Sequence, residues 1–399
     1  MDSVTLYTDE IDDLEDAAKE LFSQAEGFDF KEHSLGILMV EDETDYTGLY
    51  GLLSERWKFP IIGCTAMAML LGTEGYCGSG ISLLIMSADD CSFAAGVTGI
   101  INQDNYREEL AKLYRSLSDS LEGGEKLAVT YGCPVMEETH VSGDDVDRAI
   151  SDAAGKDIPV FGGLASDGFN FTRSRVFFNG KEVKNGQVLA LVSGNIRPKY
   201  VCVNSVKNLA NFSYEVTKSD SNQVFRLGDS TFLEAMNKAG FTTDKTDVMG
   251  DYILTPFVTS IPKEDGDHVE AARVLSFLNH NNDSGVFLGS MPEGSLLRIG
   301  FINRDDVQES VRQAFEDIRQ EMDKEDYEYH TLLCSTCAAR FLALASNTRA
   351  EAEACKSSLP EGFSLLGLYA YGEFCPVKGE KKERDYNMFH NFTFAILAL

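Results

Sequence analysis

The chain has 399 residues, of which 43% are hydrophobic and 10% aromatic, and its formal net charge is −29. This composition indicates a folded globular protein with one large core or two ordinary ones. The negative charge argues against nucleic acids and anionic membranes as partners, because both select basic surfaces. We therefore expect a protein that binds neither of them.

The N-terminal residues Met1 to Val4 are acidic and show no signal-peptide pattern. The longest apolar stretch, residues 61–71, is too short to span a bilayer. Nine cysteines scattered along a chain of this length form no disulfide framework and are typical of reduced thiols. We find no metal-ligand spacing, no P-loop and no dinucleotide fingerprint. These features predict a cytoplasmic protein with no metal site and no cofactor.

Strand-like and helix-like patterns alternate along the first sixty residues, which is typical of a layered α/β arrangement. The strand-like segments are residues 4–7 and 33–40, and the helix-like segments are residues 11–22 and 44–57. Two further strand-like segments, residues 81–87 and 91–98, are separated by three residues. This short connection predicts a β-hairpin.

Two amphipathic helices share one spacing and lie 201 residues apart. The first face consists of Tyr106, Leu110, Leu113, Tyr114, Leu117 and Leu121, and the second of Val307, Val311, Ala314, Phe315, Ile318 and Met322. The strand-like segments that follow, residues 127–133 and 331–337, correspond at an offset of 204. This repetition predicts an α/β fold with mixed sheets, made of two homologous β-β-α-β-α-β-β halves, residues 1–207 and 208–399, that are packed together.

Three apolar, strand-like segments end in glycines followed by polar residues. Glycine at the end of a strand lets the backbone turn sharply or approach another segment closely. These glycines are Gly63 in the first segment, Gly162, Gly163 and Gly168 in the second, and Gly367 and Gly372 in the third. We expect the three strand ends to meet around a polar cleft.

Short motifs at these strand ends resemble those of the FIST family. In the first half they are Gly63-Cys64-Thr65, the stretch from Phe161 to Gly168, Phe178-Asn179-Gly180 and Gln187-Val188; in the second half they are Cys337-Ala338-Ala339-Arg340, the stretch from Gly367 to Glu373, and His390-Asn391-Phe392-Thr393. The motifs follow the order of the family over nearly the whole chain. The resemblance identifies an N-terminal FIST module in residues 1–207 and a C-terminal one in residues 208–399.

The resemblance implies an intracellular sensory protein in signal transduction. Such a protein would bind a small polar ligand, with an amino acid as one candidate, and would act on a signalling protein partner. Two alternatives remain open. One is an enzyme on the same scaffold, with Cys64 or Cys337 as nucleophile or Glu373 as general base, and the other is an acidic scaffold for protein interactions. The sequence favours a binding protein over an enzyme, and we assign no catalytic residue.

The second half contributes four candidate ligand contacts: Arg340, Glu373, Tyr371 and Asn391. An arginine at a strand end can hold a carboxylate through its bidentate fork. Glu373 can receive an ammonium group, or it can pair with Arg340 and fix the strand end. Asn391 can close a turn or contact the polar end of a ligand.

The first half contributes Ser166, Asp167, Cys64 and Thr65. Ser166 and Asp167 can cap backbone amides in the glycine turn or contact the ligand directly. Cys64 and Thr65, at the first glycine strand end, can likewise have a structural role in the turn or contact the ligand. Because the second half carries Tyr371 and Glu373 where the first carries Ser166 and Asp167, we expect more of the chemistry in the second half.

Overall fold

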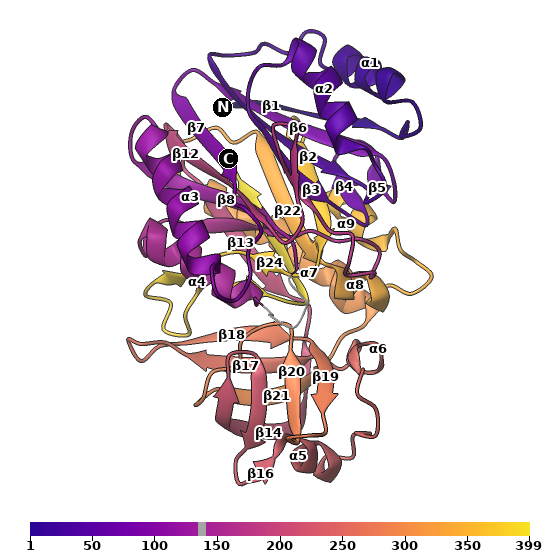
Figure 1. The fold of residues 1–399 in the computed structure, drawn as a ribbon, viewed down its shortest axis with the longest axis vertical. Coiled ribbons are helices and arrows are strands. Elements are labelled where there is room, and N and C mark those ends of the chain that lie inside the picture. Colours follow the sequence, from indigo (N-terminus) through magenta and orange to yellow (C-terminus); the bar gives the residue numbers. More distant parts are fainter. Residues whose placement is uncertain (135–140) are drawn as a thin grey trace.

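The chain folds into a core of three similar α/β units and a β-sheet domain that is inserted into the third unit. The computed structural model describes residues 1–134 and 141–399, and Figure 1 shows the core above the inserted domain. Both chain termini lie in the core.

The first unit alternates strands and helices as the sequence predicts. Its elements are β1 (Asp2–Thr8), α1 (Leu14–Gln24), β2 (His33–Val40), α2 (Tyr46–Arg56), β3 (Ile61–Thr65), β4 (Met69–Leu71), β5 (Gly75–Cys77) and β6 (Ile81–Ala88). Helix α1 begins after Asp13, whose side chain accepts hydrogen bonds from the N–H groups of Glu15 and Asp16. The helix then buries Ala17 and Leu21 in the core.

The second and third units repeat this plan. The second consists of β7 (Cys91–Val97), α3 (Tyr106–Ser120), β8 (Glu125–Gly132), α4 (Gly143–Ala154), β9 (Val160–Leu164), β10 (Val176–Phe178), β11 (Lys181–Val183) and β12 (Gln187–Gly194). The third consists of β13 (Lys199–Asn204), α7 (Arg304–Met322), β22 (Thr331–Cys337), α8 (Ala338–Ala343), α9 (Ala350–Ser358), β23 (Ser364–Ala370), β24 (Glu373–Phe374), β25 (Val377–Lys378), β26 (Asp385–Tyr386), β27 (Phe389–His390) and β28 (Thr393–Ala398). The predicted α/β fold with internal duplication is confirmed, and the first unit is a third occurrence of the same plan.

The three core sheets share one strand order. In each unit the first strand pairs with the last, the last with the second, and the second with the third, which gives β1-β6-β2-β3, β7-β12-β8-β9 and β13-β28-β22-β23. The second and third strands are parallel and the other pairs are antiparallel. Each sheet is completed by strands of another unit: β10 joins β3, β24 joins β9, and β4 joins β23. This cyclic exchange ties the three units together.

Glycines let the parallel strands of the first two units approach closely. A Cβ atom at Gly63 in β3 would lie 1.9 Å from the carbonyl oxygen of Leu38 in β2. At Gly162 in β9, where φ is +149°, a Cβ atom would lie 1.7 Å from the carbonyl oxygen of Thr130 in β8. Only glycine fits such contacts, so these two positions fix where β3 and β9 lie.

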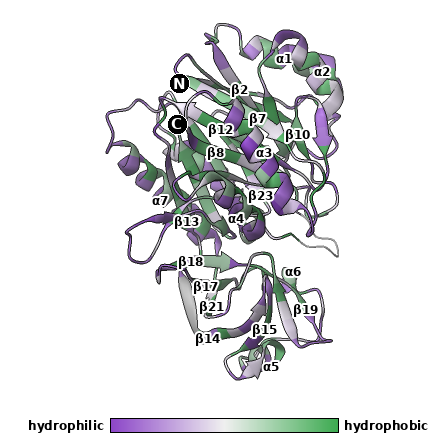
Figure 2. Ribbon diagram, turned by 60° about the vertical axis from the view of Figure 1, so that its left-hand side comes forward, coloured by the Kyte–Doolittle hydropathy of each residue, from purple (hydrophilic) through white to green (hydrophobic). Residues whose placement is uncertain are grey.

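The sheets of the core pack against one another through apolar faces. One buried cluster takes residues from all three units, such as Ile37, Val129 and Leu333. Figure 2 shows mainly hydrophobic residues along the strands of the core and both hydrophilic and hydrophobic residues along the helices around it. The C-terminal strand β28 is fully buried within this arrangement, as expected for a central strand.

The inserted domain lies between β13 and α7, where the other units connect their first strand directly to their first helix. Its elements are β14 (Asn208–Asp220), β15 (Gln223–Leu227), β16 (Ser230–Thr231), α5 (Phe232–Lys238), α6 (Met249–Tyr252), β17 (Phe257–Pro262), β18 (His268–Arg273), β19 (Leu275–Asn279), β20 (Ser284–Phe287) and β21 (Leu296–Phe301). These strands form one antiparallel sheet with its own buried cluster. The predicted domain boundary at residue 207 falls at the start of this insertion, and it stays a prediction.

The hairpin predicted for residues 81–98 is wrong. Strand β6 pairs with β1 and β2, whereas β7 pairs with β12 in a different sheet. The short connection between them joins the first unit to the second. The sequence pattern showed two adjacent buried strands, but it could not show that their hydrogen-bond partners belong to separate sheets.

No helix among residues 1–134 and 141–399 combines the length and hydrophobicity needed to cross a membrane.

Candidate functional site

The three glycine strand ends meet, as expected, and Ser166 joins them. The Ser166 N–H donates to the carbonyl oxygen of Thr65 at 3.1 Å. The Ser166 hydroxyl accepts a hydrogen bond from the N–H of Met67 at 2.9 Å and donates one to the carbonyl oxygen of Tyr369. Ser166 and Thr65 have no exposed surface. The expected polar cleft at this point is therefore filled by protein atoms.

Asp167 organises the loop that follows β9. Its carboxylate accepts hydrogen bonds from the N–H groups of Phe171, Thr172 and Arg173 at 2.7–2.9 Å and from the Tyr371 hydroxyl at 2.6 Å. Burial of the carboxylate acts to raise its pKa, but the hydrogen bonds outweigh burial and the pKa of Asp167 is lowered. Asp167 is thus a charged acceptor that holds the loop in one conformation.

This loop forms one wall of a cavity of about 380 Å³ between the core and the inserted domain, which we call the interdomain cavity. The core contributes Phe169, Phe171, Cys337, Ala338, Ala339, Leu342, Ala370 and Tyr371, and the inserted domain contributes Asp247, Met249, Gly250, Ile253, Val274 and Leu288. The rings of Phe171 and Tyr371 stack with their centroids 4.4 Å apart. The cavity has mostly apolar walls, and among the described residues that line it Asp247 is the one charged residue.

Behind the strand ends lies a buried polar cluster centred on Glu373, which pairs through its backbone with Gly163 and His390. One carboxyl oxygen of Glu373 accepts a hydrogen bond from the Thr393 hydroxyl at 2.7 Å. The other oxygen has no hydrogen-bond partner among the described residues, and neither has either amide atom of the buried Asn391. Burial raises the pKa of Glu373 well above its usual range. Buried polar atoms without a protein partner are rare and mark sites of interest.

Arg340 lies on α8 and pairs with a carboxylate other than Glu373. Its guanidinium forms an ion pair with Glu351 at 2.6 Å and donates hydrogen bonds to the Ser310 hydroxyl and the Val307 carbonyl oxygen. Neither side chain of the ion pair has exposed surface. The pairing of Arg340 with Glu373 that we considered from the sequence is wrong, because a nearer carboxylate occupies the guanidinium. The structure places Arg340 in the packing between α7, α8 and α9, and its predicted ligand contact stays a prediction.

Cys64 and Thr65 belong to the interior of the core. The Cys64 side chain lies in the apolar cluster shared by the three units, and its burial raises the pKa of the thiol. The Thr65 hydroxyl accepts a hydrogen bond from the N–H of Arg175 at 3.2 Å. Burial also raises the pKa of Cys337, and the nearby Glu373 adds to this effect. Cys64 and Cys337 therefore remain protonated thiols, which disfavours them as nucleophiles.

Comparison with known proteins gives two matches to family models. The model of the FIST N domain matches residues 34–230, and the model of the FIST C domain matches residues 241–376. The chain belongs to the FIST family. FIST domains are generally sensory domains that bind small ligands in signalling proteins.

Similar solved structures cover the whole FIST chain at low sequence identity. A chorismatase matches with a TM-score of 0.38 and 9% identity, and a cyanuric acid hydrolase with a TM-score of 0.40 and 8% identity. Each match covers 100% of this chain and 98% of the other. No curated protein matches the chain in sequence.

The sequence did not single out the residues that form most of the interdomain cavity. Phe169 and Phe171 follow the glycine motif directly, and two aromatic residues at the end of a polar turn are a signal that could have found them. Asp247 and the apolar residues of the inserted domain gave no such signal, because their place opposite the strand ends depends on how that domain packs on the core.

Proposed function

We propose that this FIST protein senses a small ligand that binds in the interdomain cavity. The observation that carries the proposal is the position of this cavity, whose walls come from the strand ends of the core on one side and from the inserted domain on the other. Ligand-binding sites are commonly concave, mostly apolar and placed between domains, with volumes from about 300 Å³ upward. A volume of about 380 Å³ suits a ligand of metabolite size.

The lining residues favour a ligand with an apolar or planar body and a neutral or cationic polar end. Phe171 and Tyr371 offer stacked aromatic faces, and Asp247 offers a carboxylate to an amine. An amino acid with an apolar side chain meets both conditions through its side chain and its ammonium group. Its carboxylate would face no cationic side chain among the lining residues that the structure describes, so we place the corresponding amine ahead of the free amino acid.

Signalling would follow from the two-sided construction of the cavity. A ligand that touches both walls binds most tightly to the arrangement of core and inserted domain in which both walls are in place. Its differential affinity then shifts the population toward that arrangement, which a signalling partner would recognise. A cytoplasmic location is supported by the cysteines, since all nine are free thiols.

A thermal-shift series on the full chain tests the proposal. Aromatic and aliphatic amines, the matching amino acids and neutral analogues would be compared. A true ligand present at one hundred times its Kd stabilises the folded state by about 2.7 kcal/mol. If no compound of these three classes raises the melting temperature, the proposed site is wrong.

Two variants locate the binding. Ala339→Phe fills the cavity and should abolish the shift, whereas Ala343→Phe on the same helix lies outside the cavity lining and should leave it unchanged. Asp247→Asn should weaken amines by roughly five- to tenfold and neutral analogues hardly at all, with the exposed Asp244→Asn as its matched control. Amine binding that survives Ala339→Phe would place the site elsewhere.

A further inference from the structure

The sheet of the third unit has an open edge at β13. In the strand order β13 is the outermost strand, and β28 is its neighbour. The other edge of β13 forms no backbone hydrogen bond with any part of the chain that the structure describes. An open strand edge presents unpaired N–H and C=O groups, which can pair with the backbone of another chain.

The pairing of β28 shows which backbone groups of β13 face this edge. Leu399, which follows β28, exchanges two hydrogen bonds with Thr331 of β22. Successive residues of a strand direct their N–H and C=O groups alternately to its two sides. Ala398 therefore bonds to its partner Lys199 in β13, and so does every second pair along the two strands. The residues between them direct their backbone groups to the open edge, and these are Tyr200, Cys202 and Asn204.

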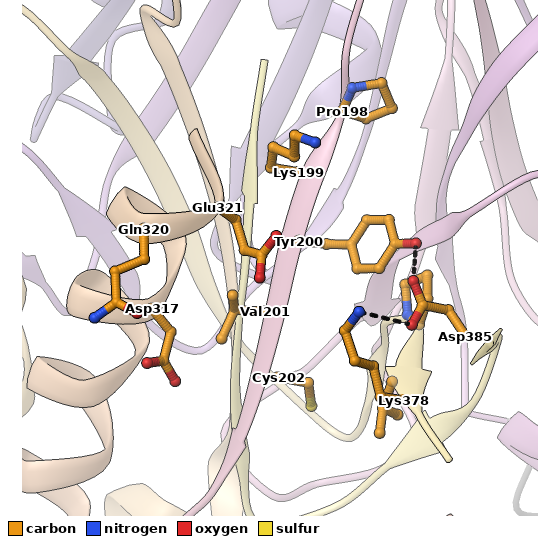
Figure 3. Close-up of a pocket in the computed structure, with 12 residues that line it drawn as sticks. Pro198, Lys199, Tyr200, Val201, Cys202, Asp317, Gln320, Glu321, Lys378 and Asp385 are labelled. Atoms are coloured by element: carbon orange, nitrogen blue, oxygen red, sulfur yellow. Dashed lines mark hydrogen bonds and ion pairs between the residues drawn. The ribbon is translucent and has the colours of Figure 1, made fainter. Parts of the chain in front are cut away.

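A cavity of about 510 Å³ lies along this edge and is called here the β13 cavity. One wall consists of Asp317, Gln320 and Glu321 of α7, and the opposite wall includes Pro376, Val377 and Lys378. Figure 3 shows the α7 residues on one side of β13 and Lys378 on the other. The open edge thus lies at the bottom of a groove with two walls.

The side chains of β13 alternate between the two faces of its sheet. Val201 and Val203 pack with the apolar face of α7, whereas Tyr200 and Cys202 pack against the cluster that the three units share. Paired strands direct their side chains to the same two faces. A strand added to the open edge would therefore point every second side chain to the α7 wall and the others to the opposite wall.

The α7 wall is acidic. Asp317 accepts a hydrogen bond from Gln313 at 2.7 Å and forms no ion pair with a described residue. Glu321 pairs with Lys324, whose side chain is exposed, at 2.6 Å. Basic side chains that reach this wall would meet two carboxylates.

The two lysines of the β13 cavity already have carboxylate partners. Lys199 Nζ lies 2.9 Å from Glu325, and Lys378 Nζ lies 3.9 Å from Asp385. The Tyr200 hydroxyl also donates a hydrogen bond to Asp385, at 2.7 Å. These pairs leave the carboxylates of the α7 wall as the groups that an incoming chain would meet.

We propose that the β13 cavity is the docking site for an extended segment of a partner protein, in which basic residues alternate with apolar ones. The segment adds a strand to the open edge of β13, and backbone hydrogen bonds supply the affinity. The acidic α7 wall selects the basic side chains. A second copy of this chain is disfavoured as the occupant, because each copy carries a net charge of −29. The β13 cavity shares no lining residue with the interdomain cavity, so this proposal does not depend on ligand binding there.

Fluorescence anisotropy with the full-length protein tests the proposal. The probe is a labelled heptapeptide in which lysine and valine alternate, and its control carries glutamate in place of lysine. The lysine peptide should bind at least about tenfold more tightly. The proposal is overturned if the lysine peptide does not bind, or if the two peptides bind equally.

A pair of N-methylated peptides tests for strand addition. One carries the methyl groups on the valine nitrogens and the other on the lysine nitrogens. Because the N–H groups of a strand point alternately toward and away from its neighbour, one of the two peptides should lose binding and the other should keep it. Equal behaviour of the two would contradict an added strand.

Variants locate the site. Cys202→Pro removes an N–H group that points to the open edge and keeps the bonds of β13 to β28, so it should weaken the lysine peptide at least about tenfold. Asp317→Asn/Glu321→Gln should weaken it about three- to tenfold. The matched control is Glu309→Gln/Glu316→Gln, which changes two exposed carboxylates of α7 outside the cavity and should bind as the wild type.

Folded Cys202→Pro that binds the lysine peptide as tightly as the wild type would place the site elsewhere. Sedimentation of the wild type separates a partner protein from a second copy. A dimer that Cys202→Pro dissociates would assign the open edge to self-association and overturn the proposal. If Cys202→Pro does not fold, the N-methylated peptides decide.

Discussion

The strand ends of the second and third units have the same origin in the fold but different uses. After β9, Ser166 and Asp167 bond to backbone groups of their surroundings and to Tyr371, so this end works as a clamp. After β23, Tyr371 reaches the interdomain cavity and Glu373 keeps one carboxyl oxygen without a partner among the described residues. Asp167 and Tyr371, which correspond at the repeat offset of 204, bond directly to each other. The strand end after β9 therefore holds the loop, whereas the strand end after β23 reaches the interdomain cavity.

The largest loss of stability should come from replacing Arg340, whose buried ion pair with Glu351 links α8 to α9. Arg340→Met leaves Glu351 buried without its partner and should cost about 3 to 5 kcal/mol of unfolding free energy, measured by urea denaturation. The double variant Arg340→Met/Glu351→Leu should recover most of this loss. A loss below about 1 kcal/mol in the single variant would show that the ion pair is not structural.

Asp167→Ala should have the next largest effect, because it removes the acceptor of three loop N–H groups and of the Tyr371 hydroxyl. We expect a loss of about 2 to 4 kcal/mol, less than the sum of four buried bonds since water can reach part of the loop. The control is Asp157→Ala, which changes an exposed residue before β9. If both variants unfolded at the same urea concentration, Asp167 would not stabilise the loop after β9.

Ser166→Ala tests the junction of the three strand ends. It leaves the Met67 N–H and the Tyr369 carbonyl without their bonds, and the expected loss is about 1 to 2 kcal/mol. The matched control is Ser23→Ala on the exposed surface of α1, which should be neutral or slightly stabilising. Equal unfolding free energies for the two variants would mean that Ser166 does not hold the junction.

Glu373→Gln should have the smallest effect at low pH and a growing one at high pH. Burial raises the folded-state pKa of Glu373 above its unfolded value of about 4.5, so the folded protein binds this proton more tightly than the unfolded chain. The proton-linked stability is complete below pH 4.5 and is lost as the pH rises through the folded pKa. Urea denaturation between pH 5 and pH 9 should show wild-type stability falling relative to Glu373→Gln.

Parallel pH curves for the wild type and Glu373→Gln would contradict this prediction and would place the third strand end with the second as a purely structural element. Glu353→Gln, an exposed change on α9, provides the control and should follow the wild-type curve.

The site was predictable where chemistry depends on neighbours in the sequence. Asp167 caps N–H groups four to six residues ahead of it. The polar turn after the paired glycines predicted this capping role. Arg340 was not predictable in the same way. The sequence offered Glu373 as the partner of Arg340, and only the tertiary structure placed Glu351 of α9 beside its guanidinium.

The sequence by itself determined the α/β class, the repetition and the positions of the glycine strand ends, because periodicity and glycine spacing are local properties that each segment carries alone. The tertiary structure decided which strands pair, and with them the cyclic exchange of β4, β10 and β24 among the three sheets. It also decided where the cavities lie. Hydrogen-bond partners and burial are set by segments far apart in the chain, so they exist only once the whole fold has formed.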